Sequence, residues 1–122
     1  MPQPPSEPPT DEQFWCSNDR NRPNVDFLRD FLAREGRLSH EQALWIIQSA
    51  AEVLRKEKTL LRLELPIAIC GNIVGQYYDL IKVLDVVGDA ADSRYLFLGN
   101  YVQKGYFGIE VCSMPVLEVM LM

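Results

Sequence analysis

Residues 66–75 read PIAICGNIVG, and residues 94–105 read RYLFLGNYVQKG. In both stretches a short apolar run ends in a loop framed by glycines, a pattern typical of a buried strand followed by a turn. Between them, residues 76–87 carry apolar side chains at helical spacing up to Gly88. Two strands joined by a helical crossover are expected to pair in parallel. The sequence therefore predicts a βαβ unit with both glycine loops at one edge of its sheet.

Loops at this edge are where open α/β sheets bind ligands, because glycines allow backbone and ligand to approach closely. A metal or phosphate site would need carboxylate, imidazole or guanidinium groups in these loops. The positions available for such a site hold only neutral or singly cationic side chains: Asn72, Val74, Asn100, Gln103 and Lys104. The residues alone therefore predict two site loops without the side chains of a working site.

A short amphipathic helix is predicted over residues 25–36. Val25, Leu28 and Leu32 recur at helical spacing, with Asn24 as the N-cap and Gly36 as the C-cap. The class of the fold is accordingly α/β, with amino-terminal helices followed by the βαβ unit.

A longer helix is predicted from Ser39 to about residue 58. Ser39 and Gln42 have the spacing of a capping box, in which each side chain reaches the backbone N–H of the other residue. Trp45 is interpreted as a packing residue, with an exposed interface anchor as the alternative. The apolar stripe of this helix is predicted to be Leu44, Ile47, Ala51 and Leu54.

A third helix is predicted to begin near Tyr106 and to end at Pro115, because proline lacks a backbone donor and clashes with the preceding turn. The apolar residues after Pro115 form the carboxyl end of the chain. We expect this apolar end to be a contact surface for a protein partner.

Length and charge narrow the function classes. With 122 residues the chain has room for one small domain, and its net charge of −5 gives no electrostatic footprint for nucleic acid or an anionic membrane. No stretch has the roughly 20 apolar residues of a membrane span. The three cysteines, Cys16, Cys70 and Cys112, are widely spaced and predict neither a disulfide framework nor a zinc site. We expect a cytoplasmic protein.

Residues 1–24 differ in composition from the rest of the chain, because they contain six of the eight prolines with polar and acidic residues between them. Such a segment buries too little apolar surface to offset its ordering entropy. It is predicted to be a disordered Pro-rich leader, with residues 25–122 as the domain. The leader is interpreted as a plain flexible tail. The alternative is a ligand for an aromatic groove of a protein partner, because Pro2-x-x-Pro5 and Pro5-x-x-Pro8 are polyproline II patterns.

From about residue 23 to residue 110 the chain resembles the calcineurin-like, metal-dependent protein serine/threonine phosphatases. The patterns of that family, G-D-x-H-G and G-D-x-x-D-R-G, stand here as GNIVG and GNYVQKG. The flanking stretches VDFLRDFLAREGRL, LRKEKTLL and GQYYDLIKVL carry the same resemblance. It implies that residues 25–122 are a truncated piece of the metallophosphoesterase α/β sandwich.

The resemblance also assigns roles to the loop positions. The family uses two divalent metals, such as Fe, Zn or Mn, to activate water and stabilise phosphoryl transfer. Its metal ligands in the two loops correspond to Asn72, Val74 and Asn100, and its histidine-orienting and phosphate-binding residues correspond to Gln103 and Lys104. Neutral amides and valine are poor ligands for hard cations, so we expect no metal cofactor and no catalytic residue in this chain.

These departures predict a catalytically inactive pseudophosphatase that acts through a partner, or a decayed gene product without a selected role. A working serine/threonine phosphatase is the alternative. The family's remaining metal ligands come from later segments, and so do its calmodulin-binding and regulatory-subunit-binding segments. We expect all of these to be absent here, so neither partner is transferred to the chain.

Overall fold

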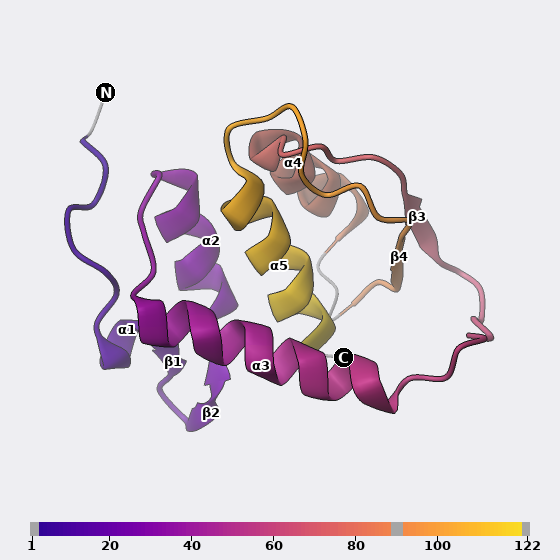
Figure 1. The fold of residues 1–122 in the computed structure, drawn as a ribbon, viewed down its shortest axis with the longest axis horizontal. Coiled ribbons are helices and arrows are strands. Elements are labelled where there is room, and N and C mark those ends of the chain that lie inside the picture. The colour runs from indigo at the N-terminus through magenta and orange to yellow at the C-terminus, as the bar shows by residue number, and fades with distance from the viewer. Residues whose placement is uncertain (1–2, 89–91, 121–122) are drawn as a thin grey trace.

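The computed structural model describes residues 3–88 and 92–120 and combines helices with two small sheets, as expected for an α/β chain. No helix in these two stretches is long and apolar enough to cross a bilayer. In Figure 1 the long helix α3 runs beneath α5, and α5 contacts α2, α3 and α4. The elements in chain order are α1 (Asp11–Phe14), β1 (Trp15–Cys16), β2 (Asp19–Pro23), α2 (Val25–Ala33), α3 (His40–Lys56), β3 (Ala68–Cys70), α4 (Tyr77–Val87), β4 (Tyr95–Phe97) and α5 (Gly108–Met120).

The predicted βαβ unit is confirmed. Strands β3 and β4 pair in parallel, with Ile69 opposite Leu96, and α4 forms the crossover between them. Gly88 ends α4 with a φ of 106°, a conformation that glycine adopts without strain. The two strands are only three residues long each.

Helix α2 starts as predicted and ends earlier. The Asn24 side chain accepts a hydrogen bond from the Phe27 N–H at 3.2 Å, which confirms the N-cap. The left-handed residue after the helix is Glu35, with a φ of 62°, and the predicted cap Gly36 instead donates its N–H to the Phe31 carbonyl at 3.0 Å. Gly36 is required for space, because a Cβ there would lie 2.5 Å from the Phe31 ring. This is a Schellman ending, in which the glycine occupies the position after the left-handed residue.

Helix α3 has the predicted capping box, since Ser39 and Gln42 exchange hydrogen bonds of 3.0 and 3.2 Å. The predicted apolar stripe is wrong: Leu44 and Ile47 are 42% and 64% exposed, whereas Ile46 and Ala50 are buried. The helix has two adjacent apolar faces, and the one bearing Ile46 joins the core. Leu54, on the predicted stripe, is also 56% exposed.

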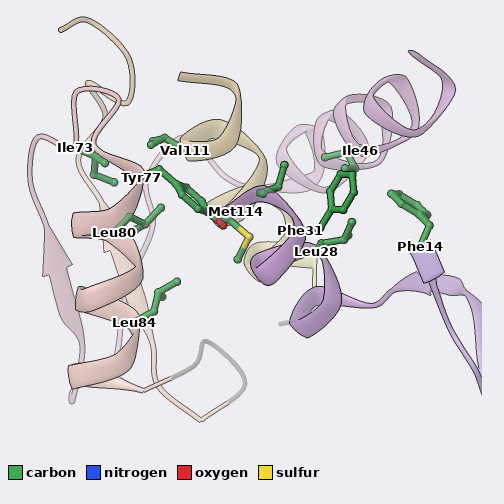
Figure 2. Packing of buried hydrophobic residues seen from close by; sticks show 11 residues of the cluster. Phe14, Leu28, Phe31, Ile46, Ile73, Tyr77, Leu80, Leu84, Val111 and Met114 are labelled. Atoms are coloured by element: carbon green, nitrogen blue, oxygen red, sulfur yellow. The ribbon is translucent and has the colours of Figure 1, made fainter. Parts of the chain in front are cut away.

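The core joins all of the longer helices. Figure 2 shows the side chains of α4 and α5 meeting next to those of α2, with Phe14 at the far end of the same cluster. The buried cluster consists of Phe14, Leu28, Phe31, Leu32, Ile46, Ile73, Tyr77, Leu80, Leu84, Val111 and Met114.

The segment predicted as a disordered leader contains ordered elements in its second half. Residues 11–23 form the short helix α1 and the antiparallel pair β1–β2. Phe14 is 1% exposed, and its carbonyl accepts a hydrogen bond from the Asn24 N–H at 2.8 Å. The prediction is based on the average composition of 24 residues, which is polar. It overlooks the large apolar surface that the Phe14 side chain alone buries. The division of the chain at residue 24 stays a prediction.

Helix α5 continues past the predicted stop. It begins at Gly108, close to the expected start, but the backbone stays helical through Pro115 to Met120. A proline inside a helix removes one i to i−4 hydrogen bond and strains the turn before it. Here that preceding turn holds the fully buried Val111 and Met114, and their packing offsets the loss of a single bond.

Candidate functional site

The two glycine loops, residues 71–75 and 99–105, follow β3 and β4 and lie side by side. The Asn100 carbonyl accepts hydrogen bonds from the N–H groups of Ile73 and Val74, at 3.3 and 3.0 Å. The Gly75 N–H donates to the Tyr101 carbonyl at 2.6 Å. The predicted meeting of the loops at one edge of the sheet is therefore confirmed.

Hydrogen bonds also run in the opposite direction. The Val74 carbonyl accepts from the N–H groups of Lys104 and Gly105, at 3.3 and 2.7 Å, and the Gly75 carbonyl accepts from the Phe107 N–H at 3.4 Å. All of these bonds join backbone to backbone. The loops are thus connected without the use of the side chains at the candidate site positions.

Three of the loop glycines are explained by this arrangement. A Cβ on Gly105 would lie 2.2 Å from the Gly75 carbonyl oxygen, and a Cβ on Gly75 would lie 2.9 Å from the Gly105 oxygen. Gly99 has a φ of 95°, which disfavours any other residue. Gly71 has open space around it and an ordinary φ, so neither sterics nor backbone conformation requires glycine there.

Two of the predicted site residues line a hollow, and the other three lie exposed on the second loop. Asn72 and Val74 line a hollow of about 440 Å³ formed by the end of β3 and the start of α4. Asn100, Gln103 and Lys104 are exposed on the second loop and do not contribute to the lining of this hollow. The backbones of the loops touch, but the site side chains of the second loop do not line the hollow that Asn72 and Val74 line.

Asp79, an acidic residue that belongs to neither glycine motif, lines the same hollow. It lies in the first turn of α4, where a carboxylate complements the helix dipole. Its position one turn after the first loop was the available signal. Cys70 also lines the hollow, and burial raises the pKa of its thiol, which favours the unreactive protonated form.

Two of the site positions have left-handed backbone conformations. Asn100 has a φ of 56°, which asparagine tolerates because its side chain can hydrogen-bond locally. Val74 has a φ of 51°, and for a β-branched residue this conformation costs about 1–2 kcal/mol. The backbone at position 74 therefore has a shape that its side chain does not favour.

The chemistry offered by the loops is that of neutral amides. Asn72, Asn100 and Gln103 can donate and accept hydrogen bonds, Val74 can do neither, and Lys104 contributes a positive charge. Within residues 3–88 and 92–120, no three His, Cys, Asp or Glu side chains come together in a way that could hold a metal ion.

The chain is similar in sequence to known protein phosphatases. The chain is 50% identical, over 102 residues that make up 84% of its length, to serine/threonine-protein phosphatase 2B catalytic subunit A1 of Saccharomyces cerevisiae. It is 47% identical over 102 residues to catalytic subunit A2 of the same organism. The chain spans 18% and 17% of the lengths of these relatives. No protein-family model matches it.

Proposed function

Since the chain belongs to the calcineurin-like serine/threonine phosphatase family, we propose that it is a catalytically inactive member that acts by binding other proteins. The observation that supports this proposal is that the two loops keep their backbone arrangement and lack the side chains that the reaction needs. The backbone contacts that join the loops are complete, whereas the five positions that would do the chemistry hold no carboxylate, imidazole or guanidinium.

The amino-terminal helices and the βαβ unit correspond to one part of the metallophosphoesterase α/β sandwich, with β3 and β4 as two of its strands. Phosphatases of this type bind their metals at the carboxyl ends of such strands, and here the two loops occupy that edge.

The residues present do not fit a pair of divalent metals. Two-metal catalysis needs anionic oxygens that bind both ions and offset their charge. Asn72 and Asn100 offer neutral oxygens, and Val74 has no lone pair. The carbonyls of Asn100 and Val74 each accept two backbone hydrogen bonds already, so they are poor substitutes as ligands.

Phosphate recognition is weakened for a separate reason. Lys104 is exposed and presents a single ammonium group, which lacks the planar pair of donors that lets arginine hold two phosphate oxygens at once. Gln103 cannot supply the negative charge that would orient and polarise a histidine. We propose that metal binding and phosphate binding are both lost.

Partner binding is assigned to the Pro-rich leader, whose Pro5-x-x-Pro8 pattern has the chemistry of a polyproline II ligand. Pro8 is exposed and Pro5 is half-buried. The apolar carboxyl end that the sequence also indicates lies outside the described side chains.

Metal-dependent phosphate release tests the loss of activity. The purified chain is assayed at neutral pH with Mn²⁺ on p-nitrophenyl phosphate and on a phosphoserine peptide, with yeast phosphatase 2B catalytic subunit A1 as the positive control. We expect no release above the protein-free rate. Release by this chain that a chelator abolishes and Mn²⁺ restores would show a working phosphatase.

A further inference from the structure

The side chain of Gln42 makes hydrogen bonds at both of its ends. Its Oε1 accepts the Ser39 N–H at 3.0 Å and completes the capping box of α3. Its Nε2 donates to the Pro9 carbonyl at 2.7 Å. One side chain therefore caps the long helix and also fastens a residue of the leader that lies 33 positions earlier in the chain.

The hydrogen bond to the Pro9 carbonyl is of the kind that can hold a proline-rich segment in place. Proline has no N–H, so its carbonyl is the only backbone group that can be hydrogen-bonded, and a buried carbonyl needs a partner. Pro9 is buried. The next residue, Thr10, begins α1 with a capping box of its own, in which the Thr10 N–H donates to Gln13 Oε1 at 3.0 Å.

A second contact between the leader and α3 lies one helical turn further along the helix. The Trp45 ring meets the Trp15 ring edge-on, with centroids 4.7 Å apart, and it also meets the buried Phe14 at 6.2 Å. Residues 9–15 are therefore held on the first two turns of α3 by an amide at one point and by aromatic rings at another. Trp15 and Trp45 are also the only two tryptophans in the chain.

We propose that Gln42 is a latch, which holds the leader on α3 and limits the access of a proline-binding protein to Pro5-x-x-Pro8. This inference rests on the proposed function, in which the leader is the partner-binding segment. A polyproline II ligand places both prolines in an aromatic groove of the partner, and in the docked leader Pro8 is exposed while Pro5 is half-buried. Access is therefore limited at Pro5. A leader that is docked most of the time binds with an affinity reduced by the fraction undocked.

Gln42→Glu separates the two contacts of the side chain. Glutamate serves as well as glutamine at this position of a capping box, and its charge suits a helix amino terminus, so α3 keeps its cap. The amide donor is lost, and a carboxylate oxygen faces the Pro9 carbonyl in its place. Gln13→Glu is the matched control, because it makes the same chemical change in the capping box of α1 while Gln42 still holds Pro9.

Two measurements on the full chain report the state of the latch. Amide hydrogen exchange of residues 10–14 should be about tenfold faster in Gln42→Glu than in the wild-type chain and in Gln13→Glu, since a hydrogen bond is replaced by a repulsive contact. Tryptophan emission should shift to longer wavelength in Gln42→Glu alone. The helix signal in far-ultraviolet circular dichroism should be equal in all three proteins, which shows that α3 stays folded.

A panel of immobilised SH3 and WW domains reports on access to the leader. At least one domain should bind Gln42→Glu about tenfold more tightly than the wild-type chain and Gln13→Glu. Equal exchange rates in the three proteins would overturn the latch and leave the proposed function standing. Faster exchange in Gln42→Glu, with no domain binding any of the three, would overturn the control of access and also the leader's proposed role as a ligand.

Discussion

Gly75 and Gly105 face each other across the two loops so closely that a side chain on either cannot be accommodated. A Cβ on Gly105 would meet the Gly75 carbonyl oxygen at 2.2 Å and its carbonyl carbon at 2.3 Å. Both neighbours are backbone atoms, which cannot rotate away. The contact joins the last glycine of each motif, and it holds the loops that follow β3 and β4 together.

Gly105→Ala should destabilise the chain by about 1–3 kcal/mol, because the added methyl group must push the two loops apart. Gly71→Ala is the matched control, since a Cβ at that position meets nothing within 4 Å. The free energies of unfolding come from urea titrations followed by circular dichroism. Equal losses in the two variants would show that the loops are not in contact.

Val74→Asn should stabilise the chain by about 1 kcal/mol, because asparagine tolerates the left-handed conformation that valine resists. Val102→Asn serves as the control on the neighbouring loop, where the backbone has no positive φ and the side chain is 50% exposed. Urea unfolding midpoints measure both. A loss of stability in Val74→Asn at least as large as in Val102→Asn would contradict the strain at position 74.

Tyr77 should make the chain less stable above pH 10. Burial raises the pKa of its hydroxyl above the ordinary value of 10.0, Glu110 raises it further and Arg29 opposes the rise. Below pH 10 the hydroxyl is protonated in both the folded and the unfolded chain, and its contribution to stability is complete. Above pH 10 only the unfolded chain releases the proton, so unfolding becomes easier by up to about 1.4 kcal/mol per pH unit.

Tyr77→Phe isolates this effect, because it removes the titrating group. It also removes the 3.0 Å hydrogen bond from the hydroxyl to the Arg29 carbonyl, so below pH 10 we expect Tyr77→Phe to be less stable than the wild-type chain by about 1 kcal/mol. The difference in unfolding free energy between the two proteins should therefore shrink as the pH rises from 9 to 11. A constant difference over that range would exclude the predicted titration.

Phe14→Ala should cost about 3–5 kcal/mol, as expected for a fully buried phenylalanine. The same substitution at the exposed neighbour, Glu12→Ala, should change stability by less than about 0.5 kcal/mol. Urea denaturation followed by circular dichroism gives both values. A negligible cost for Phe14→Ala would indicate that the whole leader is disordered, as its composition predicts.

The purified chain should contain no stoichiometric Mn, Fe or Zn. The matched variant restores the family residues at all five positions: Asn72→Asp, Val74→His, Asn100→Asp, Gln103→Asp and Lys104→Arg. We expect this variant to bind one divalent metal weakly, because the loop backbones already lie together. Inductively coupled plasma mass spectrometry measures the metal content of both proteins.

The restored variant should still show little phosphatase activity. The chain has a single histidine, His40, which is exposed at the start of α3 and is not part of the loops, so a second metal would lack imidazole ligands. One bound metal cannot polarise both the attacking and the leaving oxygen. Turnover by the restored variant in the range of ordinary enzymes would contradict this expectation.

Local signals in the sequence predicted local structure well. The N-cap at Asn24, the capping box at Ser39 and the stop at Gly88 each depend on a few neighbouring residues, and all three are confirmed. The parallel pairing of β3 and β4 also followed, because a helical crossover leaves few other arrangements.

Features that depend on distant partners were not predictable in the same way. The face of α3 that is buried depends on which neighbour packs against it, and periodicity alone favoured Ile47 over Ile46. The continuation of α5 through Pro115 depends on how firmly Val111 and Met114 are packed. The contact of Gly75 with Gly105 joins residues 30 positions apart, so the sequence showed the two glycines but not their meeting.

The backbone connection between the loops has a consequence for how such a chain tolerates change. Because the carbonyls and N–H groups do the joining, the exposed side chains at positions 72, 103 and 104 are free to vary without unfolding the edge of the sheet. A mutation that removes chemistry at these positions leaves the architecture in place. The two loops at this edge of the sheet could therefore be redesigned to carry new ligands, one residue at a time.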